Sequence, residues 1–208
     1  MVALLVILSL GSRQPKKPEI IAVTIPEGFT RVEAADAFAI KLANFDKEKF
    51  LLLAETREGY LFPDTYYFFP TDGEEDALRL MSANYNKKIE PFLSAILELG
   101  KTEKEIITMA SLVESEAKGD ADREFISGIL WKRLTLRMPL GVDAAPETYK
   151  IKGLPKSPIA NPGIKAIQAA LYPKTSPYLY YLHDAEGNIH YAKSFEEHKI
   201  NKQKYLRE

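Results

Sequence analysis

The segment spanning residues 102–117 constrains the fold of this chain more strongly than any other. Thr102 and Glu105 form the S/T-x-x-E pattern of a capping box, which marks the start of a helix. Apolar residues then recur at the spacing of one helical face: Ile106, Met109, Ala110, Val113 and Ala117. The pattern predicts a helix with an apolar stripe, the most apolar helix of the chain.

Similar start signals divide the first part of the chain. Residues 19–25 are typical of a strand, and Thr30 with Glu33 forms a second capping box that opens a helix. A further short helix is predicted after Asp46. Together these elements predict a small strand–helix–helix lobe.

The last part of the chain mixes a helix with a hairpin. Asn161 and Pro162 form an N-cap and first-position pair that opens a helix reaching about residue 171. Residues 178–183 and 189–192 flank a turn-rich segment and predict a β-hairpin. Ser194 with Glu197 then caps a final helix.

These elements predict an α+β fold, with a mostly helical domain that has short strands and a C-terminal β-hairpin. We place an apolar N-terminal segment and linker at residues 1–18, a small lobe at 19–58 and the larger domain at 59–208. A chain of 208 residues can bury roughly two thirds of its unfolded surface, which is enough for a real core.

Composition excludes several classes of function. Twenty-eight Lys and Arg against 29 Asp and Glu give a net charge of −1, which weakens the case for a nucleic-acid-binding protein. The absence of cysteine excludes disulfides, a thiol nucleophile and cysteine-bearing metal sites. The three histidines do not form a zinc-binding helical pair, and neither a G-x-S-x-G elbow nor a phosphate-binding loop is present. We therefore predict no metal and no cofactor.

The first ten residues, MVALLVILSL, are apolar. A membrane-spanning helix needs about 20 such residues, and no basic segment precedes these as in a signal peptide. The segment is either a core element or the remnant of a longer export or anchor segment, and the pattern leaves both open.

Residues 60–70 carry six aromatic side chains in eleven positions. Aromatic residues favour pleated surfaces, so the segment could be a buried strand. Flat apolar rings also stack on sugar faces, so it could instead form a carbohydrate platform, with Tyr66 as the candidate contact.

Carboxylates are the remaining candidates for chemistry. Glu114 and Glu116 lie in the most apolar predicted helix, about 160° apart around its axis at 100° per residue. They therefore cannot form the close pair that a two-carboxylate glycosidase uses. One carboxylate desolvated by apolar neighbours can stay protonated and serve as a general acid. Both could equally be ordinary solvated residues, and periodicity does not choose between them.

Several blocks, in this order, resemble a known family. They are residues 58–68 (EGYLFPDTYYF), 110–117 (ASLVESEA), Met138-Pro-Leu with Asp143, and 152–163 (KGLPKSPIANPG), followed by residues 178–181, His190 and Glu197-His198. Together they closely resemble the endolytic murein transglycosylases, the MltG or YceG-like family. The resemblance covers roughly residues 23–206, and residues 19–58 resemble part of its small LysM-like domain.

The resemblance implies a bacterial enzyme anchored in the cytoplasmic membrane by a single segment, with its catalytic domain outside the cytoplasm. Such enzymes cut the β-1,4 bond between N-acetylmuramic acid and N-acetylglucosamine in nascent peptidoglycan strands. They leave 1,6-anhydro ends and use neither water nor a metal. Cell-wall synthases, the penicillin-binding proteins, are the implied protein partners.

The same resemblance assigns residue roles. The catalytic glutamate, the first of the V-E-x-E helix, falls on Glu114. Glu116, Asp143, Asn161 and Tyr66 are the expected substrate contacts. Prolines stiffen the loop that carries Asp143 and Asn161, which lowers the entropy lost when it presents polar groups to a sugar.

The chain also departs from the family pattern. Residues 143–149 run almost directly into Lys152, and only Thr148 and Tyr149 remain of the family's S-P-Y-N-T-Y motif. A second interpretation is therefore a non-catalytic glycan-binding or scaffold protein of the cell-wall machinery.

Overall fold

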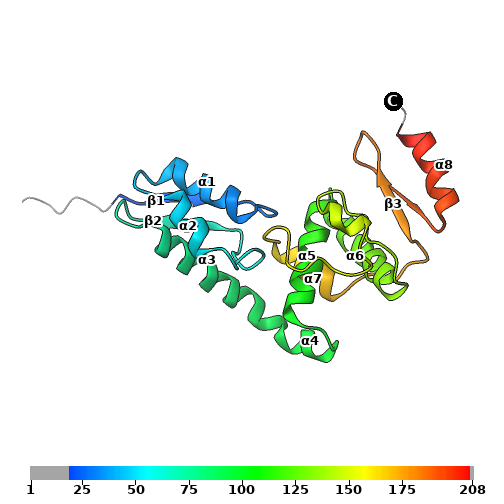
Figure 1. Ribbon diagram of the computed structural model, residues 1–208, viewed down its shortest axis with the longest axis horizontal. Coiled ribbons are helices and arrows are strands. Elements are labelled where there is room, and N and C mark those ends of the chain that lie inside the picture. Colours follow the sequence, from blue (N-terminus) through cyan, green and yellow to red (C-terminus); the bar gives the residue numbers. More distant parts are fainter. Residues whose placement is uncertain (1–18, 207–208) are drawn as a thin grey trace, which may run out of the picture.

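The computed structural model describes residues 19–206, so the apolar N-terminal decamer lies outside the described residues. In this range the strands form two antiparallel pairs and the remaining elements are helical, a mixed α+β fold as the sequence predicts. Figure 1 shows an elongated molecule, with the first strand pair at one end and the second at the other.

The N-terminal unit packs two strands against two short helices. Strand β1 (Ile21–Thr24) pairs antiparallel with β2 (Thr65–Phe68), and α1 (Arg31–Lys41) and α2 (Lys47–Leu53) lie between them in the chain. The predicted capping box at Thr30 and the N-cap at Asp46 are confirmed. At the centre, the ring of Phe38 lies 5.4 Å from that of Phe68, edge to face.

Helix α3 (Glu74–Ile89) leads from this unit to the second one (Figure 1). The first half of α3 contributes Ala77 and Met81 to the N-terminal cluster, and the segment before it contributes Leu61 and Tyr66. Packing therefore carries the N-terminal unit beyond residue 58, because β2 has to pair with β1. The division of the chain into a lobe at 19–58 and a domain at 59–208 stays a proposal.

The second unit is mostly helical. Its elements are η1 (Glu90–Phe92), α4 (Leu93–Glu98), α5 (Glu103–Glu116), α6 (Asp120–Thr135), η2 (Pro146–Tyr149), α7 (Ile164–Leu171), β3 (Tyr180–His183), β4 (Ile189–Ala192) and α8 (Phe195–Tyr205). The predicted C-terminal hairpin is confirmed: β3 and β4 pair antiparallel, with Tyr181 opposite Tyr191.

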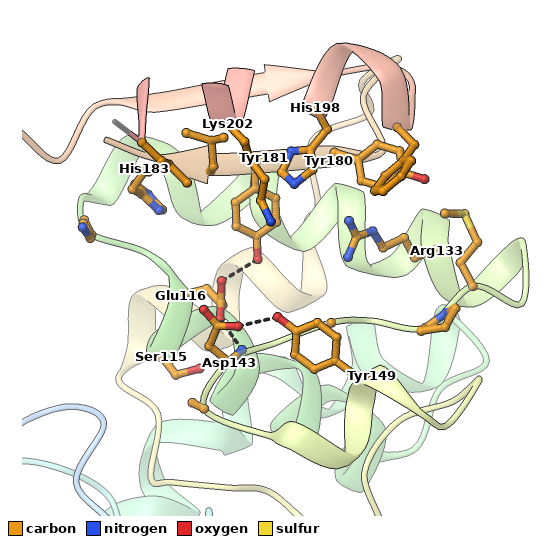
Figure 2. Close-up of a pocket in the computed structure, with 18 residues that line it drawn as sticks. Ser115, Glu116, Arg133, Asp143, Tyr149, Tyr180, Tyr181, His183, His198 and Lys202 are labelled. Atoms are coloured by element: carbon orange, nitrogen blue, oxygen red, sulfur yellow. Dashed lines mark hydrogen bonds between the residues drawn. The ribbon is translucent and has the colours of Figure 1, made fainter. Parts of the chain in front are cut away.

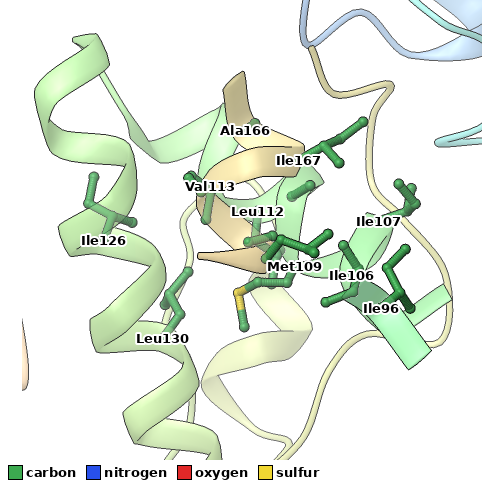
Figure 3. Close-up of a cluster of buried hydrophobic side chains, with 14 of the residues drawn as sticks. Ile96, Ile106, Ile107, Met109, Leu112, Val113, Ile126, Leu130, Ala166 and Ile167 are labelled. Carbon is green, nitrogen blue, oxygen red and sulfur yellow. The ribbon is translucent and has the colours of Figure 1, made fainter. Parts of the chain in front are cut away.

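Helix α5 is the centre of the second unit. Its predicted capping box is present, with the Thr102 hydroxyl accepting from the Glu105 backbone N–H. Residues 106–113 are all buried, so the helix is covered on every side rather than along one stripe. The side chains of Met109 and Leu112 lie in one cluster with residues from α6 and α7, as Figure 3 shows.

One predicted boundary is wrong. Helix α7 begins at Ile164 with Gly163 as its N-cap, not with Asn161 and Pro162. The physical reason is that the Asn161 side chain is already used in long-range hydrogen bonds to residues 29, 58, 59 and 61. It has no capacity left to cap a helix.

Candidate active site

A cavity of about 790 Å³ opens where the C-terminal end of α5 meets the hairpin. Its floor is formed by the end of α5 and the loop 138–144, and its opposite wall by β3 and α8 (Figure 2). Polar groups face each other across it: Glu116, Asp143 and Tyr149 on one side, and Tyr181, His183, His198 and Lys202 on the other.

Glu116 places a carboxyl group in this pocket. It is the last residue of α5, and its carboxylate accepts hydrogen bonds from two different segments. The Tyr181 hydroxyl donates to its Oε2 at 2.8 Å, and the Asp143 backbone N–H donates to its Oε1 at 3.2 Å. Glu116 therefore joins the hairpin to the loop 138–144.

Burial raises the pKa of Glu116 above its ordinary value. The hydrogen bonds from Tyr181 and from the Asp143 N–H favour the ionised form and oppose this effect, while the nearby Asp143 carboxylate adds to it. Desolvation is the largest of these causes, so the net shift of the pKa is upward. A carboxyl group with a raised pKa is suited to give a proton to a leaving group near neutral pH.

Asp143 lies beside Glu116 and is oriented by a tyrosine. The Tyr149 hydroxyl donates to Asp143 Oδ1. This bond raises the pKa of Tyr149 to about 12, because the phenol that donates it must stay protonated. Asp143 is thus a second carboxylate in the pocket, which the spacing along the helix could not reveal because it comes from a distant loop.

Two basic residues at the end of α6 hold the pocket walls together. Arg133 donates through Nε to Leu179 O at 2.7 Å and through Nη1 to Leu140 O. Lys132 donates to the carbonyls of Ser176 and Pro177, both at 3.1 Å. These bonds tie the segment before β3 and the loop 138–144 to the same helix, so α6 sets the width of the pocket.

Glu114 lies outside this pocket. Its Oε1 accepts from Arg123 Nη2 at 2.9 Å, and its Oε2 accepts from the Gly163 backbone N–H at 2.9 Å. Its side chain is 6% exposed and that of Arg123 is 13% exposed, so the pair is largely buried. Both carboxylate oxygens are used to hold α5 against α6 and against the start of α7.

Asn161 is fully buried at the junction of the two units. Its Oδ1 accepts from the backbone N–H groups of Gly59 and Leu61, and its Nδ2 donates to Phe29 O and to Glu58. The side chain therefore joins three segments, and its amide contacts protein groups on both sides. This arrangement gives Asn161 a structural role and leaves no polar atom directed at a ligand.

Tyr66 is buried in the N-terminal cluster rather than exposed as a platform. Its hydroxyl donates to Phe62 O and accepts from Asn84 Nδ2 at 3.1 Å. Of the five site residues that the sequence suggested, the structure brings Glu116 and Asp143 together and leaves Glu114, Asn161 and Tyr66 elsewhere.

Tyr181 and Tyr149 lie in segments that resemble the family, but neither they nor Arg133 were among the candidate site residues. Tyr181 lies in the predicted hairpin. Strand alternation indicates on which face of the hairpin its side chain lies, but not which residue that side chain contacts. Arg133 is in the last turn of α6, where a basic residue is expected for the helix dipole alone. Their roles depend on contacts between segments far apart in the chain.

Residues 19–206 lack two other features. No group of three or more His, Cys, Asp or Glu side chains in this range is arranged to hold a metal ion. In the same part of the chain, no helix is long and apolar enough to cross a membrane.

Comparison with known proteins finds close relatives. Endolytic murein transglycosylase of Bacillus subtilis (strain 168) is 34% identical over 172 residues, covering 72% of this chain and 48% of that protein. Endolytic murein transglycosylase of Streptococcus pneumoniae serotype 2 is 28% identical over 254 aligned positions, covering 92% of this chain and 46% of that protein. The chain therefore spans about half the length of these curated relatives.

The fold has a counterpart among solved structures. The crystal structure of a YceG-like protein from Listeria monocytogenes matches with a TM-score of 0.80 and 26% sequence identity, covering 86% of this chain and 75% of that one. The sequence model of the YceG-like family matches residues 2–147 and 146–204. The two segments meet in the loop where the family motif is shortened. With nearly its whole length matched, this chain belongs to the YceG-like family.

Proposed function

We propose that this chain is a lytic transglycosylase that cleaves peptidoglycan glycan strands, with Glu116 as its general acid and base. The observation that carries the proposal is Glu116 itself, a carboxyl group with a burial-raised pKa in a cavity large enough for a sugar chain. The printed names of the B. subtilis and S. pneumoniae relatives support the same substrate and reaction.

The resemblance to the family assigns the catalytic role to Glu114, and the geometry favours Glu116. Glu114 has both oxygens engaged by Arg123 and by the Gly163 N–H, outside the cavity. A general acid has to come within hydrogen-bond reach of the atom that it protonates. Glu116 meets this requirement for a ligand in the cavity, and Glu114 would first have to break a buried ion pair.

The proposed reaction needs one acid–base residue. Protonated Glu116 gives its proton to the glycosidic oxygen as the bond from that oxygen to C1 of the muramic residue breaks. The resulting carboxylate then takes the proton of the 6-hydroxyl as its oxygen bonds to C1. The 1,6-anhydro end forms, Glu116 is protonated again, and no water is consumed. General acid–base steps of this kind contribute about 10²–10⁴-fold each.

A second candidate, hydrolysis by water, is favoured by one observation. Asp143 places a second carboxylate beside Glu116. Glycoside hydrolases use two carboxyl groups, one as acid and one as base or nucleophile. In that case Asp143 would activate water or attack C1, and the product would carry a reducing end.

Digestion of purified glycan strands in ¹⁸O-labelled water separates these reactions. A transglycosylase yields 1,6-anhydro ends without ¹⁸O, and the mass spectrum shows a loss of one water relative to a reducing end. Reducing ends that carry ¹⁸O would replace the proposal by hydrolysis. No product from a folded protein would favour the non-catalytic glycan-binding alternative.

We also propose the cellular setting that the family resemblance implies. The protein would be held in the bacterial cytoplasmic membrane by a single segment, with its catalytic domain outside, beside penicillin-binding proteins. Residues 19–58 would form part of a LysM-like domain. Protease added to intact spheroplasts would digest the catalytic domain if it is extracytoplasmic, and would leave it intact if it is inside.

A further inference from the structure

One face of α8 lines the wall of the cavity opposite Glu116. Four residues of the α8 segment line the cavity: Phe195, His198, Lys202 and Leu206. Their spacing of three, four and four residues places them along one stripe of the helix. None of the residues of α8, Phe195–Tyr205, is fully buried, so the stripe keeps some exposed surface along the cavity.

Phe195 is the apolar ring that this stripe offers to a ligand. It is 56% exposed at the first position of α8, while it lines the same cavity as Glu116. Single exposed apolar side chains are common on protein surfaces and need no explanation. A ring in the wall of a cavity that also holds a carboxyl group is a different case, because both line the space that a ligand would occupy.

Neighbouring rings hold Phe195 in place. The centre of its ring lies 5.9 Å from that of Tyr180, and Tyr180 in turn stacks on His198 at 5.4 Å. The Arg133 guanidinium lies over the Tyr180 ring at 5.1 Å from its centre. Tyr180 is therefore engaged by protein groups and acts as a support. Phe195 has the Lys199 ammonium 5.3 Å from its ring centre and still keeps exposed surface (Figure 2 shows Tyr180, His198 and Arg133).

We propose that Phe195 forms a stacking subsite for one pyranose ring of the glycan strand, supported by Tyr180. The apolar face of a sugar ring matches an exposed aromatic ring. Lys202, seven residues further along the same stripe, supplies a donor for the sugar's hydroxyl or acetamido oxygens. This inference rests on the proposed function for its ligand, and it moves the carbohydrate platform from residues 60–70 to the C-terminal helix.

The test compares three variants. Phe195→Ala removes the ring, Phe195→Leu keeps apolar area without a flat face, and Phe69→Ala removes a ring of similar exposure, 50%, that lies at the end of β2 outside the cavity. We expect Phe195→Ala and Phe195→Leu to raise KM for glycan strands roughly three- to tenfold with kcat nearly unchanged. Phe69→Ala should match the wild type.

A direct binding measurement tests the stacking subsite independently of catalysis. The dissociation constant of a GlcNAc–MurNAc tetrasaccharide is measured by calorimetry with Glu116→Gln and with the double variant that adds Phe195→Ala. A three- to tenfold weaker affinity in the double variant supports the subsite even if the wild type proves not to cleave. Equal affinities, no binding to either protein, or a Phe195→Leu variant that behaves like wild type would overturn it.

Discussion

Glu114 and Glu116 are two residues apart at the end of α5, yet their carboxylates serve different parts of the molecule. Glu114 is bonded to Arg123 and to the Gly163 N–H, and it holds helices together. Glu116 accepts from Tyr181 and from the Asp143 N–H in the wall of the cavity. Because the two side chains point about 160° apart around the helix axis, Glu114 faces the junction of the two units and Glu116 faces the cavity.

We expect Glu114→Gln to destabilise the fold. The substitution removes the carboxylate that accepts from Arg123 Nη2 at 2.9 Å in a largely buried place. The loss of a charge-assisted hydrogen bond costs about 1–3 kcal/mol, which urea unfolding would measure as a lower free energy of unfolding. The matched control is Glu116→Gln, two residues along the same helix. Unchanged stability of Glu114→Gln would contradict a structural role for this ion pair.

Glu116→Gln should behave in the opposite way, and its effect should depend on pH. Because burial raises the pKa of Glu116 in the folded state, its contribution to stability is fully present below the unfolded value and is lost as pH rises through the folded value. The glutamine variant has no such loss. We therefore expect matching melting temperatures at low pH and a higher melting temperature for Glu116→Gln at neutral pH. A variant less stable than wild type at neutral pH would contradict this.

The pH dependence of turnover should move when Tyr181 loses its hydroxyl. The Tyr181 hydrogen bond favours ionised Glu116 and so lowers its pKa. Tyr181→Phe removes that bond, and the alkaline limb of kcat/KM, where the acid loses its proton, should shift to higher pH. Tyr178→Phe is the control, because Tyr178 packs on Tyr191 in the same segment. A limb that shifts down, or shifts equally in both variants, would count against Glu116 as the acid.

Asn161→Ala should loosen the junction between the two units. It removes two accepted and two donated hydrogen bonds at a fully buried position. Buried groups left unpaired cost about 1–3 kcal/mol each, so we expect a total loss of at least about 2–4 kcal/mol in urea unfolding. Asn201→Ala, which removes one bond to Tyr191 O, should cost clearly less. Similar losses in both variants would show that the junction does not depend on Asn161.

Local patterns predicted the elements well. The capping boxes at Thr30 and Thr102 mark real helix starts, since both partners lie within one turn and need no distant contact. The Asn161–Pro162 pair failed as a start signal because the Asn161 side chain bonds residues about 100 positions away. Such a contact cannot be read from neighbouring residues.

The candidate site, like the fold, could be predicted only where the information lies within one element. Periodicity identified α5 and its two glutamates, which is information held within one helix. The choice between them depends on which segments lie against each face, and Arg123, Gly163, Asp143 and Tyr181 come from four different places in the chain. The aromatic run at 60–70 was ambiguous for the same reason, because its pairing with β1 and the packing around it decide which of its rings are covered.

The most direct test of the account is product formation by the two glutamine variants. Glycan strands are digested with wild type, Glu114→Gln and Glu116→Gln at a temperature where circular dichroism shows all three folded, and 1,6-anhydro ends are counted by mass spectrometry. We predict anhydro ends from wild type and Glu114→Gln, and a loss of about 10²-fold or more for Glu116→Gln. Cleavage that survives in Glu116→Gln and disappears in folded Glu114→Gln would contradict the account and return the catalytic role to Glu114.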